Sequence, residues 1–77
     1  MTLYNLEPCP YCRMVRDRLD ALGLPYEKRD VPPAHAERHA VRAVSGQTYV
    51  PVLVDGDVIL DDENDILAYL NKTYRQA

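Results

Sequence analysis

Residues 2–23 read TLYNLEPCPYCRMVRDRLDALG, a short apolar strand pattern that passes through two prolines into an amphipathic helix pattern. The strand extends from Thr2 to Leu6, and Pro10 stands in the first helical turn, where its missing N–H costs nothing. Gly23 supplies the C-terminal stop. Apolar side chains recur between them at helical spacing, at Val15, Leu19 and Leu22. The segment therefore predicts a strand that leads two cysteines to the beginning of a helix.

The middle of the chain predicts a second strand and a second helix. Residues 26–31 suit an edge strand, because their consecutive charged side chains would be hard to bury on both faces of a sheet. After Pro32-Pro33 a helix is expected from about Ala34 to Val44, and it stops at Ser45-Gly46. The side chains available for burial on this helix are Ala36, Ala40, Val41 and Val44.

The C-terminal third predicts a β-hairpin followed by a last helix. Residues 50–54 and 57–60 are strand-like and flank Asp55-Gly56, a pair that favours a two-residue turn with positive φ angles. The helix begins at about Asp61 or Asp62, where acidic side chains suit a helix N-terminus. Its apolar positions have helical spacing and are Ile66, Leu67, Leu70 and Tyr74.

The predicted order of elements is βαβαββα, with a right-handed crossover joining the first two strands. This order gives an α/β protein with a four-stranded mixed sheet covered by three helices, which is the plan of the thioredoxin-like fold. No repeat, low-complexity tract or linker interrupts the chain, so residues 1–77 are expected to form a single domain.

Composition excludes several classes of function. The chain of 77 residues is 47% hydrophobic and carries a net charge of −3, which favours a packed soluble globule and gives no support to nucleic-acid binding. No apolar run approaches the roughly 18 residues of a membrane span. The first residues lack the pattern of a secretory signal, so the cytoplasm is the expected location. Cys9 and Cys12 could close only a very short disulfide loop, which makes them better candidates for chemistry than for stabilisation.

The spacing Cys9-Pro10-Tyr11-Cys12 suits thiol–disulfide exchange. A helix N-terminus favours the thiolate of Cys9, because unpaired N–H groups and the helix dipole both stabilise an anion. Cys12 lies one turn further on and can attack a mixed disulfide at Cys9. We therefore expect Cys9 to be the nucleophile and Cys12 the resolving thiol. Pro10 stiffens the turn, and Tyr11 offers an aromatic face to substrate.

Three alternatives compete with this interpretation. Cys9 and Cys12 with His35 and His39 could be four zinc ligands, although residues 13–34 form a longer gap than a zinc finger uses. Both histidines neighbour charged residues, which favours solvated positions on the second helix over a ligand role. The cysteines could be inert core thiols, which the neighbouring prolines disfavour. The chain could also be a non-catalytic binding module that recognises a thiol without turnover.

At these residues the sequence resembles the glutaredoxin family, and it is also similar to the glutaredoxin-like N-terminal domains of glutathione S-transferases. The segment from Ser45 to Pro51 resembles the part of the family that presents a cis-proline opposite the active cysteine, with Tyr49 where threonine is usual. The resemblance implies that Pro51 is cis and that the backbone of Val50 pairs with the cysteinyl part of glutathione. The alternative is a trans-proline that opens a strand.

The resemblance also implies a site for the two ends of glutathione. Asp62 and Glu63 fall on an acid–serine pair that holds the γ-glutamyl group, so the acid matches and the serine does not. Arg38 stands where a polar or basic side chain often binds the glycine carboxylate, or else it is an exposed helix arginine. Leu6 occupies the place of a common lysine, and Glu7 adds a negative charge that disfavours a thiolate at Cys9 and an anionic substrate.

Together these patterns predict a glutaredoxin-like oxidoreductase that reduces protein or glutathione mixed disulfides through the Cys-Pro-Tyr-Cys dithiol. Glutathione or another low-molecular-weight thiol is the expected co-substrate, with no tightly bound cofactor and no metal. The expected partners are that thiol and disulfide-containing proteins, and the chain is expected to be a monomer. The alternative from another class is a non-catalytic thiol-binding or metal-binding module that uses Cys9 and Cys12.

Overall fold

The computed structural model describes residues 1–74 and has the predicted order of strands and helices. Its elements, in chain order, are β1 (Thr2–Asn5), α1 (Pro10–Ala21), β2 (Glu27–Asp30), a 3₁₀ turn (His35–Glu37), α2 (His39–Ser45), β3 (Val52–Asp55), β4 (Val58–Leu60) and α3 (Glu63–Thr73). None of the helices within the described residues has the length and apolar composition needed to span a bilayer.

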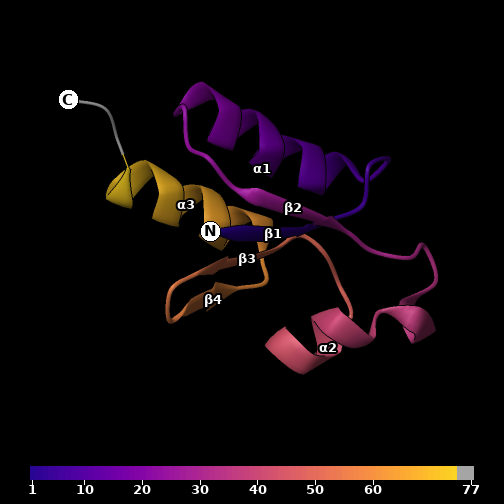
Figure 1. Ribbon diagram of the computed structural model, residues 1–77. Helices are drawn as coiled ribbons and strands as arrows, with labels where there is room; N and C mark the ends of the chain where they lie inside the picture. Colours follow the sequence, from indigo (N-terminus) through magenta and orange to yellow (C-terminus); the bar gives the residue numbers. More distant parts are fainter. Residues whose placement is uncertain (75–77) are drawn as a thin grey trace.

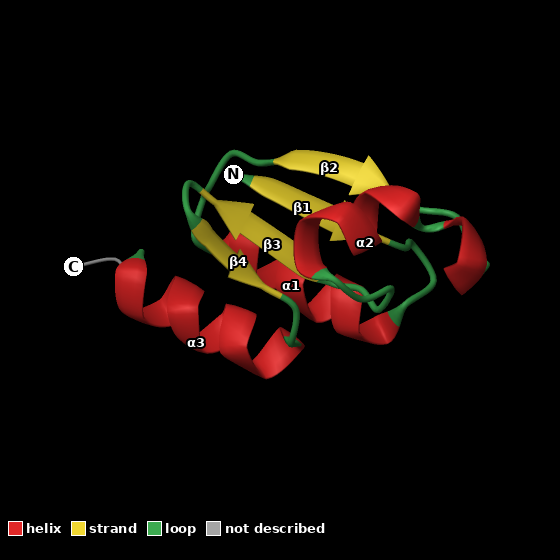
Figure 2. Ribbon diagram, turned by 90° about the horizontal axis from the view of Figure 1, so that it is seen from below, coloured by secondary structure: helices red, strands yellow, loops and turns green. Residues whose placement is uncertain are grey.

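The four strands form one mixed sheet in the order β2-β1-β3-β4. β1 is parallel to β2 and antiparallel to β3, and β3 and β4 form an antiparallel hairpin. Helix α2 lies on the opposite side of the sheet from α1 (Figure 1), and Figure 2 shows the same sheet with α2 in front of it. The thioredoxin-like fold predicted from the sequence is therefore confirmed, including the edge position of β2, whose four residues are all exposed.

Alternation along β1 and β3 divides the core between the two faces of the sheet. Leu3 pairs with Leu53, and both lie in the cluster formed with α1 and α3, whose other members are Val15, Leu19, Ile66 and Leu70. The next pair, Tyr4 and Val52, faces the other way and packs with Val31 and Val41 of α2. Because successive side chains of a strand point to opposite faces, β1 and β3 each contribute a residue to both cores.

The predicted helix 34–44 is wrong as a continuous element. The chain instead forms the 3₁₀ turn His35–Glu37, leaves the helical conformation at Arg38 with φ −87° and ψ 59°, and begins α2 at His39. Ala36 and Ala40 are exposed rather than buried, and only Val41 of this segment is fully buried. The break allows the Arg38 side chain to turn inward, which a regular amphipathic helix would not do.

The hairpin turn lies one residue later than predicted. Asp55 remains in β3 and pairs with Val58, so the two loop residues are Gly56 and Asp57. Gly56 has φ 60°, the left-handed conformation that a two-residue hairpin turn requires at its first position and that glycine adopts without steric cost. The Asp55 carboxylate accepts hydrogen bonds from Tyr69 of α3 and from Tyr74, the C-cap residue of that helix.

Candidate active site

Cys9 is the N-cap residue of α1, and local sequence explains why the helix begins there. The Cys9 N–H donates to the carbonyl of Leu6 at 3.0 Å, which closes a turn between β1 and the helix. Cys9 has extended backbone angles, and Pro10 follows at the first helical position, where no N–H is needed. The sulfur of Cys9 then accepts the backbone N–H of Cys12 at an N···S distance of 3.5 Å. Cys9 is partly exposed, and Tyr11 beside it is 52% exposed.

Cys12 has the opposite environment from Cys9. Its side chain is fully buried, and the structure shows both cysteines as free thiols. Burial is the main cause that raises the pKa of Cys12 to about 12, and the adjacent Cys9 sulfur acts in the same direction. A hydrogen bond from the Leu6 backbone and the charge of Arg16 act to lower it. One thiol is thus accessible at the helix N-terminus, while the other is a protonated thiol beneath it.

A polar network beside the cysteines was missed by the sequence analysis. Asn5 at the end of β1 is fully buried, and its amide nitrogen donates to Glu7 Oε2 at 2.6 Å and to Asp30 Oδ1 at 2.9 Å. Its amide oxygen accepts from Arg16 Nη1 at 2.5 Å. Lys28 Nζ lies 3.2 Å from Glu7 Oε2. The only local signal was Val15-Arg16 following the motif, and nothing local marked Asn5.

This network changes the electrostatic effect expected of Glu7, because its carboxylate is paired with cations. The sequence suggested an uncompensated acid next to Cys9. In the structure the Asn5 hydrogen bond and then the Lys28 hydrogen bond hold the pKa of Glu7 below its usual value, with further attraction from Arg16. Arg16 Nη1 lies 3.6 Å from the Glu7 carboxylate, and Lys28 closes the other side. The negative charge of Glu7 is therefore balanced by two cations within the network.

The bond between Val50 and Pro51 is cis, which confirms the prediction for Pro51. Pro51 is fully buried, Val50 is half-buried and Tyr49 is 68% exposed. The side chain of Gln47 brackets Tyr49, since its amide nitrogen donates to the Tyr49 carbonyl at 3.1 Å and its amide oxygen accepts the Tyr49 N–H. The loop thus presents an exposed aromatic ring two residues before the cis-proline.

Arg38 is buried, so the interpretation of an exposed helix arginine is wrong. Only 5% of its surface is exposed, and its guanidinium donates to three backbone carbonyls. These are Pro32 O at 2.8 Å, Pro33 O at 3.0 Å and Thr48 O at 2.9 Å. The planar fork therefore ties the segment before α2 to the loop before the cis-proline. Binding of a glycine carboxylate by Arg38 stays a prediction, and it would compete with these bonds.

Asp62 and Glu63 open α3 as the sequence predicted. Asp62 is the N-cap and its carboxylate accepts the backbone N–H of Asn64 at 3.4 Å, while Glu63 is the first helical residue. Both side chains are partly exposed. The second negative charge of Glu63 therefore stands at the helix N-terminus, where the resemblance implied a serine.

The two histidines do not join the cysteines. His35 Nδ1 lies 3.0 Å from Thr48 Oγ1, and its ring packs edge-on against Tyr49 at a centroid distance of 5.2 Å. His39 is exposed on α2. Within residues 1–74 no group of three or more histidine, cysteine, aspartate or glutamate side chains is placed to hold a metal ion. The zinc alternative therefore lacks an assembled ligand set in the described part of the chain.

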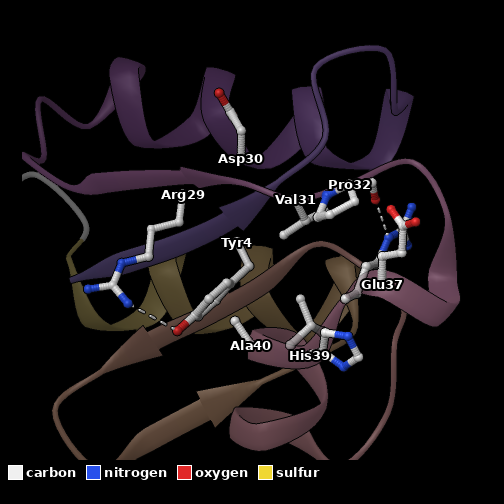
Figure 3. Close-up of a pocket in the computed structure, with 10 residues that line it drawn as sticks. Tyr4, Arg29, Asp30, Val31, Pro32, Glu37, His39 and Ala40 are labelled. Carbon is white, nitrogen blue, oxygen red and sulfur yellow. Dashed lines mark hydrogen bonds between the residues drawn. The ribbon is translucent and has the colours of Figure 1, made fainter.

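A cavity in the structure is separate from the cysteines. It has a volume of about 420 Å³ and lies between β2 and α2, with Tyr4, Arg29, Val31 and His39 among its lining residues (Figure 3). Arg29 Nη1 donates a hydrogen bond to the Tyr4 hydroxyl at 3.5 Å, and both residues line the cavity. Neither Cys9 nor Cys12 lines it. We therefore locate the candidate chemistry at the exposed N-terminus of α1 and not in this cavity.

Comparison with known proteins agrees with this arrangement. The family model described as "Glutathione S-transferase, N-terminal domain" matches residues 3–77. Prostaglandin E synthase 2 from Danio rerio is 40% identical over 96% of this chain, which spans 19% of that protein. An uncharacterized glutaredoxin-like 8.6 kDa protein in the rubredoxin operon of Clostridium pasteurianum is 29% identical over 75% of this chain and 79% of its own length.

Solved structures give the same result. A glutathione transferase homolog from Drosophila mojavensis, determined with bound glutathione, superposes with a TM-score of 0.86 at 36% identity over 95% of this chain. This chain spans 34% of that structure, so it corresponds to about a third of a transferase subunit. The match of the family model over nearly the whole sequence, together with this superposition, shows that the chain belongs to the glutathione S-transferase N-terminal domain family, which has the glutaredoxin-like thioredoxin fold.

Proposed function

We propose that this chain is a glutaredoxin-type thiol–disulfide oxidoreductase that reduces protein or glutathione mixed disulfides through Cys9 and Cys12. The observation that carries the proposal is the contrast between the two thiols. Cys9 is accessible, caps α1 and has its sulfur 3.5 Å from a backbone nitrogen, whereas Cys12 is buried one turn later and its pKa is raised to about 12. Disulfide exchange needs this division between an attacking thiol and a reserve thiol.

The reaction follows from this geometry in two exchanges. The Cys9 thiolate attacks one sulfur of the substrate disulfide, a Cys9–substrate bond forms, and the other sulfur leaves with the electron pair and takes a proton. Cys12 then loses its proton and attacks Cys9 Sγ, which releases the second substrate sulfur as a thiol. The cysteines end as a disulfide, and two molecules of a small thiol return them to the dithiol while forming that thiol's own disulfide.

Glutathione is the small thiol that we propose for this site. The Drosophila mojavensis homolog holds glutathione, and this chain shares 36% of the aligned residues with it. Asp62 at the N-terminus of α3 offers a carboxylate for an ammonium group, beside backbone N–H groups that can receive a carboxylate. We further propose a monomeric protein that works in a reducing compartment such as the cytoplasm, where thiols remain reduced.

The decisive assay is reduction of a glutathione mixed disulfide, compared with reduction of the oxidised protein by a thioredoxin reductase. We expect turnover with glutathione as reductant, loss of turnover in Cys9→Ser, and residual turnover in Cys12→Ser with a mixed disulfide trapped on Cys9. A protein that folds and forms no mixed disulfide would refute the proposal. One zinc ion per freshly purified chain, with no reversible two-electron titration, would instead support the non-catalytic metal-binding alternative.

Prostaglandin E synthesis is a second candidate, favoured by the 40% identity with prostaglandin E synthase 2 over almost the whole chain. The chain spans only 19% of that protein, so an activity of the whole relative can depend on residues outside the shared part. Assaying the same Cys9→Ser and Cys12→Ser variants for prostaglandin E formation separates the candidates. Disulfide reduction without prostaglandin formation supports the oxidoreductase alone.

A further inference from the structure

The resolving step has a difficulty that the site itself creates. Cys12 must become a thiolate to attack Cys9, but its side chain is fully buried and burial disfavours the charged form. A positive charge close to the Cys12 sulfur would lessen this cost. Among the charged groups acting on Cys12, Arg16 is the cation that opposes the effect of burial.

Arg16 is placed to act on Cys12 by helix geometry. It follows Cys12 by four residues on α1, so the two side chains share one helix face, and helical side chains lean toward the N-terminus. The guanidinium reaches Asn5 Oδ1 at 2.5 Å and the Glu7 carbonyl at 3.4 Å. These two residues flank Leu6, whose backbone forms the hydrogen bond to the Cys12 sulfur. Arg16 therefore forms hydrogen bonds on both sides of Leu6, the residue whose backbone contacts the Cys12 thiol.

The surrounding charges fix Arg16 in this position. Only 15% of its side chain is exposed, which is low for an arginine next to solvent. Asn5 is fully buried and forms hydrogen bonds to both Arg16 and Asp30 of β2. The Glu7 carboxylate forms ion pairs with both Arg16 and Lys28. A side chain held by a buried amide and a backbone carbonyl cannot swing into water without leaving the amide oxygen of Asn5 without its Arg16 donor.

We propose that Arg16, held by Asn5 and Glu7, is a positioning residue for the resolving step, where it stabilises the thiolate that Cys12 forms before it attacks Cys9. The inference rests on the proposed function and specifies which step the network serves. In that step the Cys12 proton passes to water, the Cys12 sulfur bonds to Cys9 Sγ, and the bond from Cys9 to the substrate sulfur breaks. The substrate sulfur leaves with the electron pair and takes a proton from water.

The test separates the two exchanges in the whole chain. Reduced protein is mixed with oxidised glutathione, and acid-quenched samples are followed by mass spectrometry for formation and then decay of the glutathione adduct on Cys9. For Arg16→Gln we expect decay that is about tenfold slower at neutral pH, because a tenfold change corresponds to roughly one pKa unit at Cys12. Formation should slow less, because Lys28 still balances the charge of Glu7. The difference in decay should narrow as the pH approaches the pKa of Cys12. Arg16→Lys should recover part of the rate, since it keeps the charge and loses the fork.

Arg13→Gln is the matched control, because Arg13 is exposed on the same helix and pairs only loosely with Asp17 at 3.8 Å. It should leave both exchanges unchanged. A second measurement needs no turnover: the alkaline absorbance titration of Cys12 in a Cys9→Ser background should shift to higher pH when Arg16→Gln is added. Equal titration curves and equal decay rates would overturn the inference. Absence of any glutathione adduct in the unmodified chain would overturn the proposed function, while the titration would still decide the role of Arg16.

Discussion

The backbone N–H of Cys12 lies 3.5 Å from Cys9 Sγ, while the thiol of Cys12 is buried beneath the helix N-terminus. Within one helical turn, the Cys9 sulfur thus has a hydrogen-bond donor and is partly exposed to solvent, whereas the Cys12 sulfur is buried. This inequality follows from the direction of α1 relative to the sheet, since the helix face that carries Cys12 also carries Val15 and Leu19 into the core.

Limiting alkylation should label Cys9 before Cys12. Cys9 is partly exposed, and burial raises the pKa of Cys12 to about 12, so little Cys12 thiolate exists at neutral pH. Labelling of Cys12 should increase as the pH approaches that value. Peptide mapping after a short reaction with less than one equivalent of iodoacetamide measures the order. Earlier labelling of Cys12 would reverse the roles that we assign to the two thiols.

Removing the negative charge of Glu63 should tighten binding of glutathione. Glu63 places a second carboxylate at the N-terminus of α3, where it repels an incoming carboxylate, so Glu63→Ser should lower the apparent KM for glutathione several-fold. Asp62→Asn should raise the KM through loss of the ammonium partner and still cap the helix, because asparagine is as good an N-cap as aspartate. Asp65→Ser in the same turn is the control. If neither variant changes the KM at low or high salt, the small-thiol site lies elsewhere.

The carboxylate of Asp55 should stabilise the fold only between acid and alkaline limits. It accepts hydrogen bonds from Tyr69 and Tyr74, which hold the pKa of Asp55 below its usual 3.8, while the Asp55 hydrogen bond raises the pKa of Tyr69 to about 12. A lowered acid pKa means that this stability is present above pH 3.8 and is lost as the pH falls through the folded value. Because the pKa of Tyr69 is raised, the stability that this hydrogen bond contributes is present below pH 10.0 and is lost as the pH rises toward about 12.

The matching variant is Asp55→Asn, which keeps an acceptor oxygen and removes the charge. At neutral pH we expect a Tm lower by roughly 5 °C, as loss of charge-assisted hydrogen bonds implies for a small domain. The difference should disappear in acid, where Asp55 is protonated in the unmodified chain. Asp57→Asn in the exposed turn should have no such effect. A Tm difference that does not vary with pH would show that charge is not the cause.

Removing Arg38 should destabilise the chain more than removing any exposed arginine. Arg38→Met leaves the carbonyls of Pro32, Pro33 and Thr48 without their donor, so the free energy of unfolding should fall by roughly 2–4 kcal/mol. Arg42→Met on the exposed face of α2 should change it little. Urea denaturation measures both. Unchanged stability of Arg38→Met with a raised KM for glutathione would instead assign Arg38 to the glycine carboxylate.

Much of this fold was predictable because its signals are local. Helix spacing of apolar residues after Pro10, charges along Glu27–Asp30 and acids before Glu63 each act within a few residues, and they located α1, the edge strand β2 and α3. The Cys-Pro-Tyr-Cys spacing likewise identified the candidate site, since a helix N-terminus supplies the same donors in any surroundings. By itself the sequence determined the order of the elements and which cysteine faces solvent.

Tertiary structure alone decided how the polar side chains are paired. Arg38 lies at the break in the predicted helix, and its guanidinium donates to Pro32 O before α2 and to Thr48 O ten residues later in the chain. The Asp55 carboxylate accepts hydrogen bonds from Tyr69 of α3 and from Tyr74, the C-cap residue of that helix. Asn5 joins β1, β2 and α1 through partners 25 and 11 residues away in sequence. Such contacts have no local pattern, since they depend on where the packed sheet and helices place each donor and acceptor. Burial then makes those partners obligatory, because an unpaired polar group in the interior costs free energy.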